Sequence, residues 1–204
     1  MNFANNKHII KIMIKGEFIM TYKTHANFGV FFALLVLSNL CCLGRIGIVV
    51  SIIISAIVSL LPDIDHRRSF AGKILYPILC LIVLGIAFIT VKYHIYILSF
   101  LVIWFAITSI SSHRTFSHSI IGMIMFCIPF YDSILLLPVL LGYSSHLIAD
   151  MITAGGVPLL YPFNKRRISI LKLSVGSFSE LILSVSLIIL NALIFIANVL
   201  PLFV

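Results

Sequence analysis

Charged residues are scarce in this sequence, and acidic residues are the scarcest. Only 10% of the 204 residues are charged, with 6 aspartates and glutamates against 14 lysines and arginines. Soluble globular domains carry about a quarter charged residues, whereas the mean hydropathy here is +1.20. The composition therefore excludes an ordinary soluble protein and indicates an integral membrane protein.

Several familiar catalytic and metal-binding motifs are also missing. No HExxH motif occurs, and the only glutamates are Glu17 and Glu180, which argues against a metalloprotease of the zincin type. No GxSxG motif indicates a serine hydrolase. The four cysteines form no CxxC pair and lie in apolar runs, so they indicate neither a thiolate zinc site nor a disulfide framework.

Long apolar runs, in contrast, are abundant. Most of them approach the roughly 20 residues that a helix needs to cross a bilayer. The run at 119–131 is short, and we expect it to form, with the next run, either a tight helical hairpin turning at Tyr131 and Asp132 or a re-entrant pair. The sequence predicts an all-α, polytopic membrane helical bundle of seven spans, with five or six as alternatives. The runs lie at 26–43, 46–62, 74–91, 95–112, 119–131, 133–149 and 180–204.

The net charge of +8 is explained by the positions of the basic residues. If the N-terminus is cytoplasmic and all seven runs cross, only Arg45 and Lys92 lie outside. The other 12 of the 14 basic residues then lie inside, as the positive-inside rule expects. A nucleic-acid partner is not expected, because no basic–aromatic binding motif accompanies the charge.

The chain divides into a short extension and one membrane-embedded domain. Residues 1–19 form a basic N-terminal extension, and Met20 is a possible natural start. The segment 7–20 is too short to span and lacks a signal cleavage site, so an interfacial helix is the alternative. Residues 20–204 form the single membrane-embedded domain, in which the glycines and prolines of 151–179 predict a structured loop.

Histidine and aspartate gather at the ends of the predicted spans. His25 precedes the first span, LPDIDH (61–66) closes the second, HRTFSH (113–118) follows the fourth and HLIAD (146–150) closes the sixth. All four positions face the cytoplasm in a topology that was derived from basic residues alone. Because ionisable groups at membrane depth are costly, they generally mark a functional site or pair with one another.

Each of these clusters, taken alone, has an ordinary interpretation. The pair His146 and Asp150 is spaced to share one helix face and to form a simple hydrogen bond. The acidic cluster at 63–66 could be a solvated turn, and Ser117 or Ser119 could serve only as a helix cap. Arg114 could pair with an aspartate of the 63–65 turn or bind a substrate phosphate or carboxylate.

Together, the clusters indicate a shared metal centre. Imidazole and carboxylate ligands without thiolate suit a divalent ion, for which zinc is favoured and manganese or iron are alternatives. Such an ion activates water for attack, so we expect hydrolytic chemistry.

Three motifs carry a resemblance to a known family. LPDIDHRRSFAGK, HRTFSHSI and GYSSHLIADMITAGGVPLLYPF occur in this order, and they resemble the YdjM-type metal-dependent hydrolases of bacterial inner membranes. The resemblance runs from about Met20 to Phe163 and leaves out the last run. It implies a membrane-embedded, metal-dependent hydrolase that is distantly similar to bacterial zinc phospholipase C, a helical phosphodiesterase with a His/Asp zinc cluster.

The resemblance carries the family's motif positions over to this sequence, and the chemistry of the residues suggests their roles. Thr115 stands where glycine is usual, Ser117 replaces threonine and Arg67 replaces proline, but none of these departures removes a candidate ligand. We expect Asp65 to act as a general base and Arg114 to stabilise developing negative charge. His118 is favoured over His113 as a direct ligand. The candidate metal ligands are His25, Asp63, His66, His113, His118, His146 and Asp150.

The expected protein is therefore a multi-pass enzyme of the bacterial inner membrane with its site facing the cytoplasm. Its expected partners are the lipid bilayer and a lipid or phosphoester substrate, and its oligomeric state stays open. A metal-ion carrier is the alternative, although transport requires ligands at mid-bilayer depth or reachable from both faces. A non-catalytic membrane protein with structural ion pairs is the third possibility.

Overall fold

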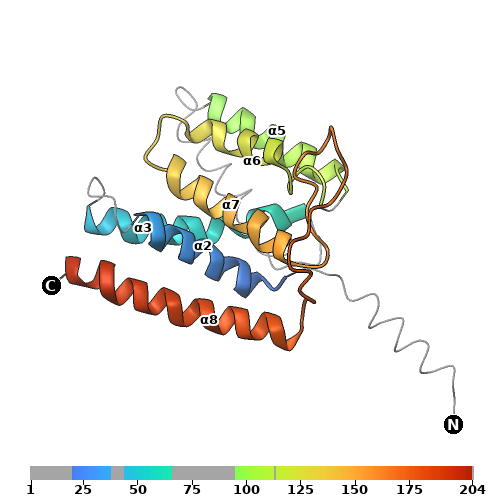
Figure 1. The fold of residues 1–204 in the computed structure, drawn as a ribbon. Helices are drawn as coiled ribbons and strands as arrows, with labels where there is room; N and C mark the ends of the chain where they lie inside the picture. The colour runs from blue at the N-terminus through green and yellow to red at the C-terminus, as the bar shows by residue number, and fades with distance from the viewer. Residues whose placement is uncertain (1–19, 38–43, 66–94, 113, 204) are drawn as a thin grey trace, which may run out of the picture.

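The architecture is entirely helical in the part of the chain that the structure describes. The computed structural model describes residues 20–37, 44–65, 95–112 and 114–203 (Figure 1). Within these ranges the only β contacts are two isolated bridges, which join Thr153 to Leu173 and Val157 to Ile168. The prediction of an all-α fold is confirmed.

The helices form a bundle in which α2, α3 and α7 pack together, α8 packs on α2, and α6 packs between α5 and α7 (Figure 1). The α-helices are α2 (Tyr22–Leu37), α3 (Arg45–Val58), α5 (Ile95–Ile110), α6 (Ile120–Cys127), α7 (Leu136–Ile152) and α8 (Phe178–Ile194). The short elements are the 3₁₀ helices η1 (Leu61–Asp65), η3 (Ile128–Phe130) and η5 (Leu200–Leu202) and the π-helix η4 (Phe195–Val199).

Glycine allows α2, α3 and α7 to approach one another closely. A Cβ atom added at Gly29 of α2 would lie 2.7 Å from the carbonyl oxygen of Ser55 in α3. A Cβ atom added at Gly142 of α7 would lie 2.4 Å from the same oxygen. Small residues permit this kind of helix contact in membranes, and here they bring three helices together at one residue of α3.

Aromatic packing joins α5, α6 and α7. Trp104 of α5 is fully buried, and its indole Nε1 donates a hydrogen bond to the carbonyl oxygen of Gly122 in α6 at 2.9 Å. Its ring lies edge-on to Phe126 of α6 and Tyr143 of α7, with centroids 5.0 and 6.2 Å away. Edge-to-face pairs stabilise such packing beyond the area they bury, so this cluster fixes α7 against α6.

Two helical segments among the described residues are long and apolar enough to cross a bilayer, namely Arg45–Asp63 and Phe178–Leu202. Shorter apolar helices occupy Ile120–Phe130 and Leu136–Ile152. The turn expected at residues 131 and 132 is confirmed, because η3 ends at residue 130 and α7 begins at 136. The run at 74–91 lies outside the described residues, and the number of spans stays a prediction.

Two expected boundaries differ from those observed. Helix α2 begins at Tyr22, ahead of the apolar run at 26, so His25 lies inside its first turn and not before it. The α-helical part of α3 ends at Val58, and Pro62 lies within the following 3₁₀ turn η1. Proline is tolerated among the first residues of such a turn, because a backbone N–H has no hydrogen-bond partner within the turn at those positions.

Candidate metal centre

Five candidate ligands from four parts of the chain meet at one end of the bundle. His25 lies in the first turn of α2, Asp63 in η1 directly after α3, and His118 in the turn before α6, while His146 and Asp150 lie near the end of α7. The histidines and Asp150 are fully buried, and Asp63 is 5% exposed. This end of the bundle holds the N-terminal end of α2 and the C-terminal ends of α3 and α7, so residues that are distant in sequence lie together there.

Four of the side chains present ligand atoms to a common point. His118 Nε2 lies 3.2 Å from His146 Nε2, 3.4 Å from Asp63 Oδ1 and 3.3 Å from Asp150 Oδ2. His146 Nε2 lies 3.7 and 3.6 Å from the same two oxygens. Tetrahedral zinc with bonds of 2.0–2.1 Å requires ligand atoms about 3.3 Å apart. The five distances given above, 3.2–3.7 Å, lie near this value, and the four ligand atoms all lie within 4.8 Å of one another.

Hydrogen bonds on the far side of two imidazole rings orient them toward this point. His146 Nδ1 lies 2.7 Å from the carbonyl oxygen of Ser59, which can only accept a hydrogen bond. His118 Nδ1 lies 2.8 Å from Ser117 Oγ. With a proton on Nδ1, each ring presents the lone pair of Nε2 to the centre. When both rings are in this tautomer, the two Nε2 lone pairs face each other at 3.2 Å and repel unless a cation lies between them. When the Ser117 hydroxyl donates to Nδ1 instead, His118 Nε2 carries the proton. Outer contacts of this kind are typical of metal-binding histidines.

His25 lies beside the four-atom group. Its Nε2 is 3.9 Å from Asp63 Oδ2 and 3.7 Å from Asp150 Oδ1, the carboxylate oxygens that face away from His118 and His146. Its ring stacks on that of His146, with centroids 4.0 Å apart and an interplanar angle of 17°. Neither ring nitrogen of His25 has a hydrogen-bond partner among the described residues. His25 therefore lies beside the four-atom group, and its role as a ligand stays a prediction.

Arg114 is the buried cation of the centre. One guanidinium nitrogen lies 2.6 Å from Asp150 Oδ1, and the residue is 4% exposed. The sequence suggested an aspartate of the 63–65 turn as the partner of Arg114, and Asp150 is a partner that it did not suggest. A bond to a charged partner is short and strong in such surroundings, so Arg114 holds Asp150 in position and offsets part of the buried negative charge.

The segment that carries His118 is fixed by its own hydrogen bonds. Ser119 is the N-cap of α6, and its Oγ accepts a hydrogen bond from the backbone N–H of Gly122 at 3.0 Å. This role was one of the expected alternatives, and it is confirmed. The hydroxyl of Tyr143 donates to the carbonyl oxygen of Ser117 at 2.7 Å and so joins α7 to this turn. The positions of His118 and His146 relative to each other are thus fixed.

Some of the residues expected at the site lie outside the described part of the chain. His66 and His113 are among them, and so is the side chain of Asp65, whose backbone ends η1. Their roles stay predictions. The sequence analysis missed the contribution of Ser59, because a carbonyl oxygen leaves no signal in a sequence. It also missed Tyr143, although an aromatic residue one turn before His146 is a signal of packing beside the site.

The buried side chains fit a divalent cation. Asp150 Oδ2 is fully buried and has no hydrogen-bond partner in the described part of the chain, although two imidazole nitrogens lie nearby. Buried carboxylates that lie this close to one another are costly without a compensating positive charge. The donor set of nitrogen and oxygen atoms is the one that zinc, manganese and iron accept.

Comparison with known proteins places this chain in a family. The family model described as YdjM inner membrane protein matches residues 20–203. The chain belongs to the YdjM inner membrane protein family. The match includes α8, which the three sequence motifs do not reach. Among its relatives, the chain is 33% identical over 129 residues to the uncharacterized protein YvsG of Bacillus subtilis, covering 61% of this chain and 65% of YvsG.

A second relative carries the family's name. The chain is 32% identical over 123 residues to the inner membrane protein YdjM of Escherichia coli, covering 54% of this chain and 49% of that protein. The match therefore spans from about half to just under two thirds of the length of these relatives. No solved structure gives a significant match. Membership of this family makes the chain a bacterial membrane protein and supports a location in the inner membrane.

Proposed function

We propose that this protein is a membrane-bound, metal-dependent hydrolase whose His/Asp centre faces the cytoplasm. The observation that carries the proposal is the four-atom group of His118, His146, Asp63 and Asp150, whose ligand atoms all lie within 4.8 Å of one another and could hold one metal ion. The bound ion, zinc in the first place, would supply water activation and charge neutralisation.

In this proposal the chain's own residues divide the remaining work. Asp65 follows Asp63 in η1, and it accepts the proton of the attacking water as general base. Arg114 holds Asp150 through their contact, and its charge favours a phosphate substrate. In the reaction, water oxygen bonds to phosphorus, the bond from phosphorus to the alcohol oxygen breaks, and that oxygen takes up a proton.

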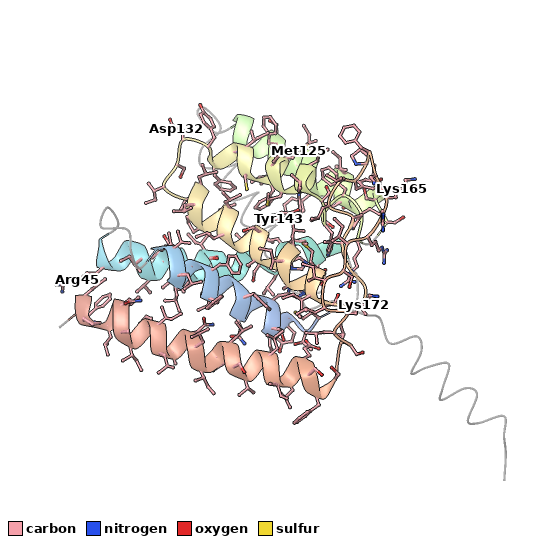
Figure 2. All side chains as sticks on the ribbon, in the orientation of Figure 1. Arg45, Met125, Asp132, Tyr143, Lys165 and Lys172 are labelled. Carbon is pink, nitrogen blue, oxygen red and sulfur yellow. The ribbon has the colours of Figure 1, made fainter. Side chains whose placement is uncertain are left out.

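A lipid or another phosphoester is the proposed substrate because of where the centre lies. The exposed loop at the same end of the bundle carries Lys165, Arg166, Arg167 and Lys172 and no acidic residue (Figure 2). Basic residues at a membrane surface attract anionic headgroups by about 1 kcal/mol each. Exposed Phe163 and Leu171 on the same loop add apolar contact with the bilayer interface.

Substitution of Asp65 tests the reaction. We expect Asp65→Asn to keep its metal and lose hydrolysis, because it removes the base without removing one of the four grouped ligands. The assay uses purified, metal-loaded protein in detergent with phospholipids and generic phosphodiester and ester substrates. If wild type turns over no substrate faster than Asp65→Asn, the hydrolase proposal is wrong. Metal transport by protein in vesicles is then the measurement that tests the carrier function.

A further inference from the structure

We infer that Glu180 of α8 is a positioning residue for the metal centre, acting through His25; the inference rests on the proposed metal centre and deepens it. Glu180 is the only acidic residue after Asp150 and is 3% exposed, although it touches none of the candidate ligands in the contacts described above. It lies in the first turn of α8, a helix that supplies no candidate ligand.

The carboxylate of Glu180 joins the N-terminal ends of two helices. Oε1 accepts hydrogen bonds from the backbone N–H of Thr21 at 2.7 Å and from the hydroxyl of Thr24 at 3.1 Å, both at the start of α2. Oε2 accepts a hydrogen bond from the backbone N–H of Gly176, just before α8, at 2.7 Å. The positive ends of two helix dipoles therefore surround one buried negative charge, which is a favourable arrangement for an anion.

This contact leads directly to His25. Thr21, whose N–H donates to Glu180, accepts on its carbonyl oxygen the backbone hydrogen bond of His25 at 3.2 Å. Thr24, the second donor to Glu180, is the neighbour of His25 in the chain and is fully buried. Glu180 thus fixes the first turn of α2 through two residues that precede His25 in the chain.

His25 depends on this backbone support more than the other histidines do. His118 and His146 have their Nδ1 atoms held by Ser117 and by the carbonyl of Ser59. His25 Nδ1 has no such partner among the described residues, and the ring contacts the centre through stacking on His146 and through the longer Nε2 contacts to Asp63 and Asp150. The position of Nε2 relative to the two carboxylates is therefore set by the first turn of α2.

A purely local role for Glu180 makes a different prediction. Ser177 is the N-cap of α8 and its Oγ accepts from the backbone N–H of Glu180, so the sequence S-x-x-E forms a capping arrangement. If capping were the whole role, loss of the carboxylate would weaken α8 and leave metal affinity unchanged. The bonds to Thr21 and Thr24 predict instead that metal affinity falls.

The test is a double-mutant cycle on full-length protein in detergent. Zinc affinity is measured by competition with a chromophoric chelator, and the absorption spectrum of bound Co²⁺ reports the ligand geometry. We expect Glu180→Gln to weaken zinc binding roughly tenfold, as loss of an outer partner does, and to give a Co²⁺ spectrum like that of His25→Ala. In the His25→Ala background, Glu180→Gln should cause no further loss, since both act through one residue.

Two further variants keep the test decisive. Thr24→Val removes one hydrogen bond to Glu180 with little change in shape, and it should weaken zinc binding in the same direction even if Glu180→Gln fails to fold. Asn191→Leu removes another α8–α2 hydrogen bond, to the carbonyl of Asn27 at 3.0 Å, and should leave zinc affinity unchanged.

Three results would overturn the inference: unchanged zinc affinity in Glu180→Gln and Thr24→Val, an equal additional loss in the His25→Ala background, or an equal effect of Asn191→Leu. In each case wild type still binds zinc, and the proposed metal centre stands. Wild-type protein that binds no zinc would instead refute the centre and, with it, the role of Glu180.

Discussion

At the scale of single residues, the centre combines buried charges, each of which would be costly without a partner of opposite sign. Asp63 and Asp150 bring two carboxylates into the interior, and Arg114 supplies a guanidinium to Asp150. Removing one partner of a buried ion pair typically costs about 3–5 kcal/mol, because the other charge is left without compensation. A bound divalent cation beside Asp150 would replace part of that compensation.

This reasoning predicts that Arg114→Ala makes stability depend more strongly on metal. The metal-free variant should unfold at a much lower temperature than metal-free wild type, whereas zinc should recover most of the difference. Thermal unfolding of both proteins, with zinc and with chelator, measures the four temperatures. The same loss of stability under both conditions would show that Arg114 and the metal do not share Asp150.

At the scale of elements, the site depends on how closely three helices approach. Gly29 and Gly142 both face the carbonyl of Ser55, and this contact sets the separation of α2, α3 and α7. Helix α2 carries His25 and α7 carries His146, while Asp63 lies in η1, which follows α3. The close-packed interior has little room to adjust to added atoms. Geometry at the metal centre is thus linked to packing farther along the bundle.

A pair of glycine substitutions tests this link. Gly142→Ser should destabilise the protein by about 1–3 kcal/mol through overpacking and should lower its zinc affinity, because it pushes α7 away from α3. Gly44→Ser is the matched control, since an added Cβ there meets nothing within 4 Å and serine is a good N-cap. Equal zinc affinity in the two variants would show that the centre tolerates movement of α7.

The elements also show which parts of the site can be predicted from sequence. Apolar runs and the spacing of His146 and Asp150 identify α7 and two of its ligands, because helical periodicity is local. The side of the membrane predicted for each span end then groups His146 and Asp150 with His25, Asp63 and His118. The contacts of Ser59 and Glu180 could not be predicted in this way, because they depend on the packing of helices that are distant in sequence.

At the scale of the whole molecule, the two ends of the bundle differ in chemistry. Lys165 and Lys172 lie at the end that holds the centre, whereas Arg45 and Asp132 lie at the opposite end (Figure 2). This separation agrees with the topology expected from the positive-inside rule, in which the first two positions are cytoplasmic and the last two are not. The orientation in the membrane remains a prediction.

Cysteine labelling in intact cells tests the orientation. In a background without native cysteines, Lys165→Cys should resist a membrane-impermeant thiol reagent and Asp132→Cys should react, because both side chains are exposed and they lie at opposite ends. Permeabilised cells provide the control, since both positions should then react. Labelling of Lys165→Cys from outside would place the centre on the other side of the membrane.

The central claim is that the buried His/Asp group holds a metal ion, and metal analysis of the purified protein tests it most directly. Wild type should carry a stoichiometric divalent ion, zinc in the first place, and His146→Ala and Asp150→Asn should each lose most of it, because each removes one of four grouped ligands. Ile148→Ala, on the exposed side of the same helix, should retain the wild-type content. Equal metal content in all four proteins, or none in wild type supplied with zinc, would contradict the account.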